Sequence, residues 1–115
     1  MNINKWLEHF SKHWADHNID AVMDLFTDDV VYWETPYYKL DSKNHLRQEW
    51  QAISTQYNII HQTEIFNSSV DNKHAIIWKL SYVRDDEIHE SAGTYLIGLN
   101  KDGLCDFFYY VSAQK

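Results

Sequence analysis

The second half of the chain contains four long segments with strand character and no helix-like segment between them, which constrains the fold more than any other feature. In the second segment apolar residues occupy every second position, a period typical of a strand with one face on a core. These residues are Ile76, Trp78, Leu80 and Tyr82. Strands joined by short turns pair antiparallel, because parallel neighbours need long crossover connections. The sequence therefore predicts an antiparallel sheet from segments 59–70, 74–84, 88–99 and 104–111.

Three segments with helical spacing of apolar residues precede these strands. They are Ile3, Trp6, Leu7, Phe10 and Trp14 in residues 3–17, Ile19, Val22, Met23 and Phe26 in residues 19–26, and Leu46, Trp50, Ile53 and Tyr57 in residues 42–57. Asn18 and Ser42 are suitable N-caps for the second and third helices. The apolar stripes need one shared surface, so we expect an α+β fold with three N-terminal helices packed on a strongly curved antiparallel sheet.

Composition limits the classes of partner. The length of 115 residues suits one domain, residues 1–115, and the formal charge of −7 argues against nucleic acid, whose binding begins with a basic surface. No apolar stretch reaches the length of a membrane span and no signal core is visible, so we expect a cytoplasmic protein without membrane contact. Cys105 is the only cysteine, and we interpret it as a packing residue.

Metal and cofactor motifs are weak in this sequence. His9, His13 and His17 stand four residues apart, a spacing that can hold a metal ion between neighbouring turns, but we interpret them as a solvated helix flank. No glycine-rich phosphate loop and no nucleophile elbow is found. We therefore predict no cofactor and no metal.

Residues 19–36 form a distinctive unit, in which a short helix passes through an Asp-Asp turn into a strand that Pro36 ends. This unit resembles the entry segment of the nuclear transport factor 2-like superfamily and, within it, the SnoaL-like proteins. The matching residues are Asp20, Leu25, Phe26, Asp28, Asp29, Val30 and Pro36. The order of the remaining elements agrees with the same family. The resemblance implies one SnoaL-like domain over residues 1–115, shaped as a cone with a pocket between the concave sheet and the helices.

The resemblance leaves two classes of function open. One is a binding module without strong catalysis, whose hydrophobic pocket takes a small aromatic or polycyclic organic molecule. The other is a small proton-transfer enzyme of the isomerase, cyclase or dehydratase type, with Glu34 as its general acid or base. Ketosteroid isomerases of this superfamily carry a tyrosine donor on the first helix, where this chain has Phe10, and that departure favours the binding module.

Glu34 and Tyr95 are the candidate catalytic residues. The isomerases place a general-base carboxylate at the end of the entry strand, and the corresponding position is Glu34 or, counted from Pro36, Thr35. Their second oxyanion donor corresponds to Tyr95, whose phenol can donate a hydrogen bond. Apolar walls would raise the pKa of a carboxyl group towards neutrality. We expect the pocket to be lined by aromatic residues: Trp14, Tyr32, Trp78, Tyr82, Phe107 and Tyr109.

Two further expectations concern histidines and assembly. His61, His74 and His89 lie in predicted strands, and some dehydratases of the superfamily use strand histidines as acid–base groups. We nevertheless expect these three histidines to lie on solvated faces of their strands.

The late strands carry apolar residues on both faces, so one face is left partly uncovered. We therefore expect a homodimer that pairs sheet to sheet.

Overall fold

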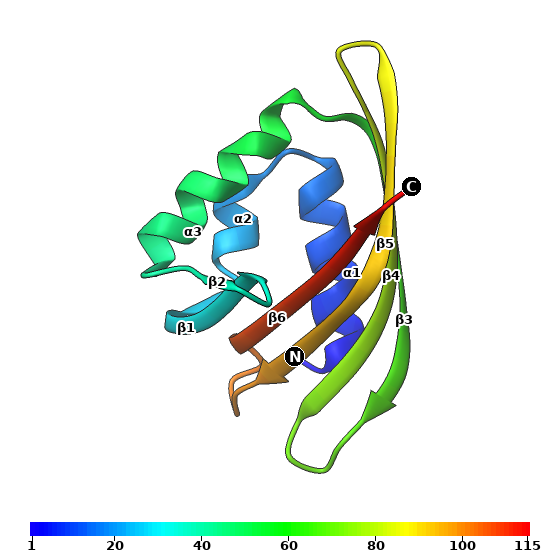
Figure 1. Ribbon diagram of the computed structural model, residues 1–115. Helices are drawn as coiled ribbons and strands as arrows, with labels where there is room; N and C mark the ends of the chain where they lie inside the picture. Colours follow the sequence, from blue (N-terminus) through cyan, green and yellow to red (C-terminus); the bar gives the residue numbers. More distant parts are fainter.

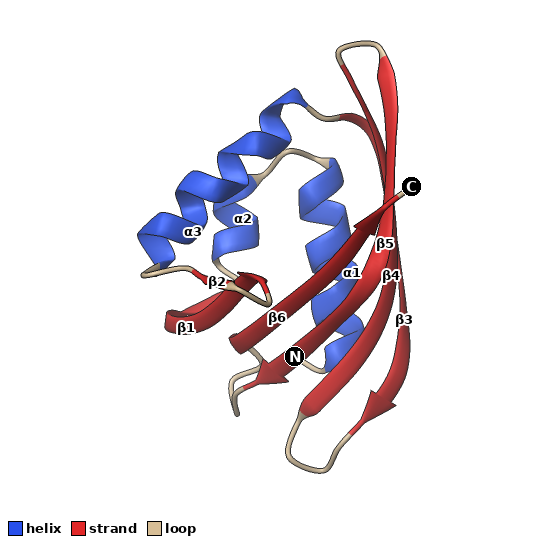
Figure 2. Ribbon diagram, viewed as in Figure 1, coloured by secondary structure: helices blue, strands red, loops and turns tan.

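Three helices cover one face of a curved six-stranded sheet in the computed structural model, which describes all residues 1–115 (Figures 1 and 2). The elements are α1 (Ile3–Ala15), α2 (Ile19–Met23), β1 (Phe26–Thr35), β2 (Tyr38–Lys39), α3 (Lys43–Trp50), the short helix η1 (Gln51–Thr55), β3 (Tyr57–Ser68), β4 (Lys73–Arg84), β5 (Glu87–Leu99) and β6 (Cys105–Gln114). The expected α+β class is confirmed. None of the helices has the length and apolar character needed to cross a membrane.

Side-chain caps fix where the helices begin. Asn18 Oδ1 accepts from the Ala21 amide at 3.1 Å, and Ser42 Oγ accepts from the His45 amide at 3.1 Å, as their types predict. The third helix ends earlier than its apolar stripe suggests, because the chain tightens into η1 after Trp50. A 3₁₀ helix has three residues per turn, so the stripe loses its phase after Ile53. Tyr57 therefore begins β3 and is 60% exposed, which corrects its expected place on the helix.

The sheet has the order β2-β1-β6-β5-β4-β3. Strands β3 to β6 pair antiparallel through short turns, as predicted. Strand β1, however, pairs with β6 in parallel, so the sheet is mixed. The chain returns from β1 to β6 only after α3 and four other strands, β2 to β5, and no short turn forces these two neighbours to be antiparallel.

A β-bulge at the start of β6 decides which of its aromatic residues face the helices. Leu99 is opposite Cys105 whereas Gly98 is opposite Phe107, so β6 carries one extra residue, Asp106. Side chains alternate between the two faces of a strand, so this extra residue moves each following side chain of β6 to the opposite face of the sheet. Cys105 and Phe108 are therefore both buried, and Phe107 turns outward.

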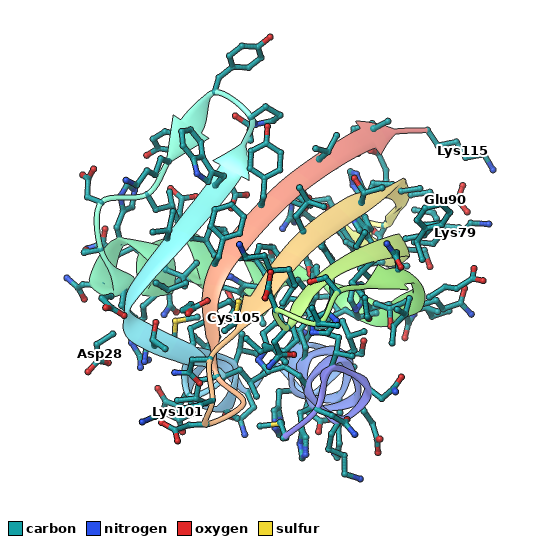
Figure 3. All side chains as sticks on the ribbon, turned by 90° about the horizontal axis from the view of Figure 1, so that it is seen from below. Asp28, Lys79, Glu90, Lys101, Cys105 and Lys115 are labelled. Carbon is teal, nitrogen blue, oxygen red and sulfur yellow. The ribbon has the colours of Figure 1, made fainter.

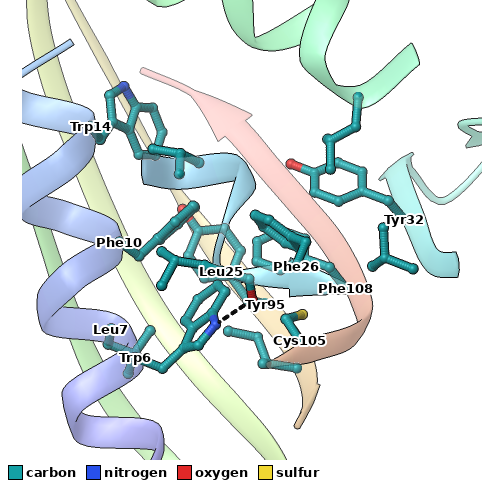
Figure 4. Packing of buried hydrophobic residues seen from close by; sticks show 14 of the residues in the cluster. Trp6, Leu7, Phe10, Trp14, Leu25, Phe26, Tyr32, Tyr95, Cys105 and Phe108 are labelled. Atoms are coloured by element: carbon teal, nitrogen blue, oxygen red, sulfur yellow. Dashed lines mark hydrogen bonds between the residues drawn. The ribbon is translucent and has the colours of Figure 1, made fainter. Parts of the chain in front are cut away.

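The core lies between α1 and the concave face of the sheet (Figure 4). Trp6 is fully buried at the centre, with its indole 4.9 Å from the ring of Phe10, and its Nε1 donates to the Leu25 carbonyl at 2.9 Å. Phe26 meets the same indole edge-on. Cys105, the first residue of β6, is buried, and Figure 3 shows it in the interior of the molecule. This position agrees with its interpretation as a packing residue. The cavity described below lies at the other end of the cone.

Candidate ligand cavity

A cavity of about 150 Å³ opens between the concave face of the sheet, the second half of α1 and the end of α3. Its residues come from α1, β1, α3, η1 and strands β4 to β6, and most of them are hydrophobic. They are Phe10, Trp14, Tyr32, Glu34, Glu49, Trp50, Ala52, Ile53, Gln56, Leu80, Tyr82, Ser91, Tyr95, Phe108, Tyr110 and Gln114. Phe10, Tyr95 and Phe108 are buried at its inner end, whereas Glu49 and Gln114 are exposed at its mouth.

Glu34 reaches the cavity from the end of β1. Tyr32 and Glu34 are two residues apart and share one face of the strand, and both line the cavity. Thr35 is exposed, so the structure places Glu34 rather than Thr35 on the cavity side. Burial, followed by the negative charge of Glu49, raises the pKa of the Glu34 carboxyl from 4.5 to about 7. A group with this pKa changes its protonation state near neutral pH. A catalytic role for Glu34 stays a prediction.

Three phenols surround the same space. Burial raises the pKa of Tyr32, Tyr95 and Tyr110 above the ordinary value, and the nearby Glu34 carboxylate adds to the effect in each case. All three phenols are therefore neutral hydrogen-bond donors across the physiological range. Tyr32 stacks on Phe108 with ring centroids 4.8 Å apart, and Tyr95 stacks on Trp78 at 5.2 Å. These stacks hold the rings rigidly in the wall.

A hydrogen-bonded chain leads from Tyr95 out to α1. The Tyr95 hydroxyl lies 2.8 Å from His61 Nε2, and His61 Nδ1 lies 2.7 Å from Ser11 Oγ. Burial lowers the pKa of His61 to about 4, so the ring is neutral and carries one N–H. When Ser11 donates to Nδ1, Nε2–H donates to Tyr95, and the phenol proton is free to point into the cavity. When the tautomer is reversed, Tyr95 donates to His61 instead.

His61 was missed by sequence reasoning, which favoured a solvated face. Its ring packs 4.7 Å from Trp14 and 5.5 Å from Phe10, so the helix covers this part of β3. The available signal was phase: Ile59, His61 and Ile65 share one face of the predicted strand. His74 is also buried, held by Ser68 and Asn72 at 2.7 Å each, whereas His89 is partly exposed and stacks on Tyr82.

Five of the eight predicted site residues line the cavity. They are Trp14, Tyr32, Glu34, Tyr82 and Tyr95. Trp78 is 1% exposed and lies behind Tyr95 in the core, because that stacked ring fills the space between it and the cavity. Phe107 and Tyr109 lie on the outer face of the sheet, because the bulge at Asp106 brings Phe108 and Tyr110 to the inner face instead. These three assignments were wrong.

Polar groups hold the helical wall of the cavity in place. Trp14 Nε1 donates to Gln56 Oε1 at 2.9 Å, and a ring nitrogen of His17 is hydrogen-bonded to the Gln56 carbonyl oxygen. Gln56, which follows η1, is thereby tied both to α1 and to the turn that follows this helix, and it is itself buried. No group of three or more histidine, cysteine or carboxylate side chains is placed to hold a metal ion.

The fold and the cavity define a cone-shaped α+β protein whose helices and curved sheet enclose a largely aromatic site. The SnoaL-like domain family matches residues 7–103, and the chain belongs to this family. The resemblance expected from residues 19–36 is thereby confirmed. No curated protein sequence matches the chain.

Solved structures of nuclear transport factor 2-like proteins share the fold. A Δ5-3-ketosteroid isomerase from Mycobacterium sp. superimposes with a TM-score of 0.81 at 15% identity, covering 98% of both chains. An NTF2-like protein of unknown function from Exiguobacterium sp. 255-15 gives 0.77 at 16% identity, covering 94% of this chain and 98% of the other. A computationally designed 17-OHP binder gives 0.78 at 18% identity, covering 96% and 95%. At these identities the likeness shows the fold alone.

Proposed function

We propose that the chain binds a small aromatic or polycyclic organic molecule in this cavity, without strong catalysis. The observation that carries the proposal is the lining itself, in which rigid aromatic rings alternate with a few converging polar groups. Phe10 lines the cavity where the isomerases of the superfamily carry a tyrosine, so one donor for a developing oxyanion is absent. The designed 17-OHP binder with this fold is a protein made to hold such a molecule.

Binding of naphthol, followed by amide chemical shifts, tests this proposal. We expect shifts confined to residues around Tyr95 and Phe108, at the inner end of the cavity. Ser91→Phe fills the cavity from β5 and should abolish them. Ser81→Phe is the matched control, because Ser81 lies on the opposite face of β4, and it should bind as the unaltered chain does. Shifts that survive Ser91→Phe, or that lie elsewhere, would contradict the proposal.

A second candidate function is proton transfer by Glu34, and the observation that favours it is that Glu34 and Tyr95 line the same cavity, where burial raises the pKa of Glu34 to about 7. In this reaction the Glu34 carboxylate takes a proton from a carbon next to a carbonyl, and the Tyr95 phenol donates a hydrogen bond to the enolate oxygen. The electron pair of the broken C–H bond moves into the enolate, and return of the proton to another carbon completes an isomerisation.

Exchange of the α-protons of an aryl ketone, tetralone, into deuterated water measures this activity directly. The rate should rise with pH through about 7 as Glu34 ionises. Glu34→Gln keeps the shape and removes the base, so the rate should fall to that of buffer alone. A rate unchanged in Glu34→Gln would assign the protein to the binding class only.

We also propose that two copies pair through the outer face of the sheet. Ile77, Leu96, Phe107 and Val111 lie on neighbouring strands of this face and are 37–46% exposed. Charged residues border this apolar patch at one end, where Glu90 Oε2 accepts from Lys115 Nζ at 3.0 Å near Lys79 (Figure 3). A self-complementary apolar patch suits a two-fold interface.

Analytical ultracentrifugation tests the pairing at a protein concentration on the order of tens of micromolar, which suits modest interfaces. The chain should sediment as a dimer, and Leu96→Lys should convert it to a monomer by placing a charge in the patch. Val70→Lys in the β3–β4 turn is the control, because Val70 is fully exposed away from the patch. A monomer in the unaltered chain would overturn this proposal.

A further inference from the structure

The cavity has charges of one sign only. Glu34 and Glu49 line it, and no lysine, arginine or histidine does. Arg84 lies beside the lining residue Tyr82, but its guanidinium is held by other groups. Arg84 donates from Nη2 to the Ala52 carbonyl and from Nε to Thr55 Oγ1, both at 2.9 Å, with its guanidinium 5.2 Å from the Tyr82 ring centroid. The site is therefore negative within a chain whose formal charge is −7.

The walls of the cavity favour the same sign of ligand charge. Their rings include Trp14, Trp50 and Tyr110, and the faces of aromatic rings carry partial negative charge. A cation above such a face is attracted, whereas an anion is repelled. The two carboxylates also differ in depth: Glu34 is partly buried, and the Glu49 side chain is 42% exposed. The Glu34 carboxylate is therefore the deeper of the two, and the Glu49 carboxylate lies nearer to solvent.

We propose that the preferred ligand is a hydrophobic amine in its protonated form. Its aromatic body would pack between the rings, and its ammonium group would lie at the mouth between the Glu34 and Glu49 carboxylates. An ammonium offers three donors, which two carboxylates can accept. This inference rests on the proposed binding of a small organic molecule in the cavity and adds the charge of that molecule.

Protons are linked to this binding. The groups that face Glu34 are Glu49 from α3, Tyr95 from β5, Tyr110 from β6 and Tyr32 on its own strand. The phenols stay neutral, so Glu34 is the member of this group whose charge changes near neutral pH. An ammonium ion favours the ionised Glu34, which has a pKa of about 7 in the free protein, and its binding below that pH releases a proton. Amine affinity should therefore rise with pH.

His45 is the one group that could compete with the ligand for Glu49. Its Nε2 lies 3.5 Å from Glu49 Oε1, and its Nδ1 lies 3.8 Å from Asp41 Oδ2. An ammonium group at Glu49 would therefore share this carboxylate with the His45 ring.

Three phenyl probes of similar shape separate charge from size: phenethylamine as the cation, phenethyl alcohol as the neutral probe, and phenylpropionate as the anion. Calorimetry at about pH 8 and about pH 5 keeps the amine protonated throughout, because an alkylammonium has a pKa similar to that of lysine. We expect phenethylamine to bind about tenfold more tightly than phenethyl alcohol at the higher pH, and phenylpropionate to bind most weakly. The advantage of the amine should shrink at the lower pH.

Variants assign the preference to the two carboxylates. Glu34→Gln should weaken phenethylamine binding about tenfold and remove most of its pH dependence, and it should weaken phenethyl alcohol binding much less. Glu49→Gln should give a smaller loss, because Glu49 is more exposed. Glu64→Gln is the matched control, since Glu64 is exposed on the outer face of β3. It should leave all three affinities unchanged.

The outcomes distinguish this inference from the proposed function. Equal or tighter binding of the alcohol or the carboxylate probe at the higher pH would overturn the preference for amines and leave a binding cavity in place. A preference for the amine that persists in the Glu34→Gln and Glu49→Gln double variant would also overturn it. Failure of all three probes to bind would count against both proposals.

Discussion

Replacing Glu34 with glutamine should stabilise the protein at high pH. In the folded chain the pKa of Glu34 is about 7, against 4.5 for an ordinary glutamate, because burial and Glu49 disfavour its charged form. Below pH 4.5 the carboxyl is neutral in both the folded and the unfolded chain. As pH rises from 4.5 to about 7 the unfolded chain loses its proton first, so stability falls across this window and stays low above it.

The size of the effect follows from the pKa difference. Each pKa unit corresponds to about 1.4 kcal/mol, so the shift sets a ceiling of about 3 kcal/mol on the stability lost between the two pH limits. Glu34 is partly exposed, and solvent screening reduces this figure to about 2 kcal/mol. Glutamine has the same shape and no charge. At about pH 8 the Glu34→Gln chain should therefore be more stable by about 2 kcal/mol, or about 8 °C in Tm for a domain of this size.

Urea unfolding of both chains between about pH 4 and about pH 8 measures the difference. His61 acts in the opposite direction, because its pKa is lowered from 6.5 to about 4 and its contribution is lost as pH falls through that window. Both chains contain His61, so its contribution cancels in the difference between them. Glu64→Gln, on the outer face, should show no pH-dependent gain. A Glu34→Gln chain no more stable than the unaltered one at about pH 8 would show that Glu34 is not desolvated.

Two other substitutions test the packing around the cavity. Gly93→Ala should destabilise the fold by about 1–3 kcal/mol, because its Cβ would lie 1.9 Å from the Val111 carbonyl oxygen and force β5 and β6 apart. Thr94→Ala on the exposed face is the control in thermal unfolding, and equal losses in both would contradict this reasoning. His61→Leu keeps the bulk of the ring but leaves the Tyr95 and Ser11 hydroxyls without their partner, and should lower stability by about 1–3 kcal/mol. Ser11→Ala removes only one of the two hydrogen bonds and should have a smaller effect, and a larger loss in Ser11→Ala would contradict this reasoning.

Local patterns in the sequence predicted most of the fold. The N-caps at Asn18 and Ser42 depend on the chemistry of single residues, and the alternation in β4 depends on a period of two, so both are visible in the sequence. Glu34 was found because side chains alternate along a strand, which puts Tyr32 and Glu34 on one face, and both line the cavity. Phe107 and Tyr109 were placed on the wrong face because the bulge at Asp106 depends on pairing with β5, which no local pattern reveals.

Environment was harder to predict than secondary structure. The enclosure of His61 results from the approach of α1, and its hydrogen bond to Tyr95 joins two strands that are not neighbours in the sheet. The parallel pairing of β1 with β6 is likewise a property of the assembled sheet. The phase of Ile59, His61 and Ile65 indicates the inner face of the strand, but the approach of α1 and the parallel pairing leave no local signal, because both depend on contacts between segments that are distant along the chain.

The parallel pairing of β1 with β6 also has a consequence for how the cavity forms during synthesis. Glu34 is synthesised early, but its strand pairs with the last strand of the chain, where Tyr32 lies opposite Phe108. The only other neighbour of β1 is the two-residue strand β2. A chain that leaves the ribosome N-terminus first therefore holds β1 without this partner until the last strand is complete. Such distant pairings form slowly, since the loop between the strands must close first. Premature termination before Cys105 would leave the carboxylate that defines the site on an unpaired edge, exposed to water.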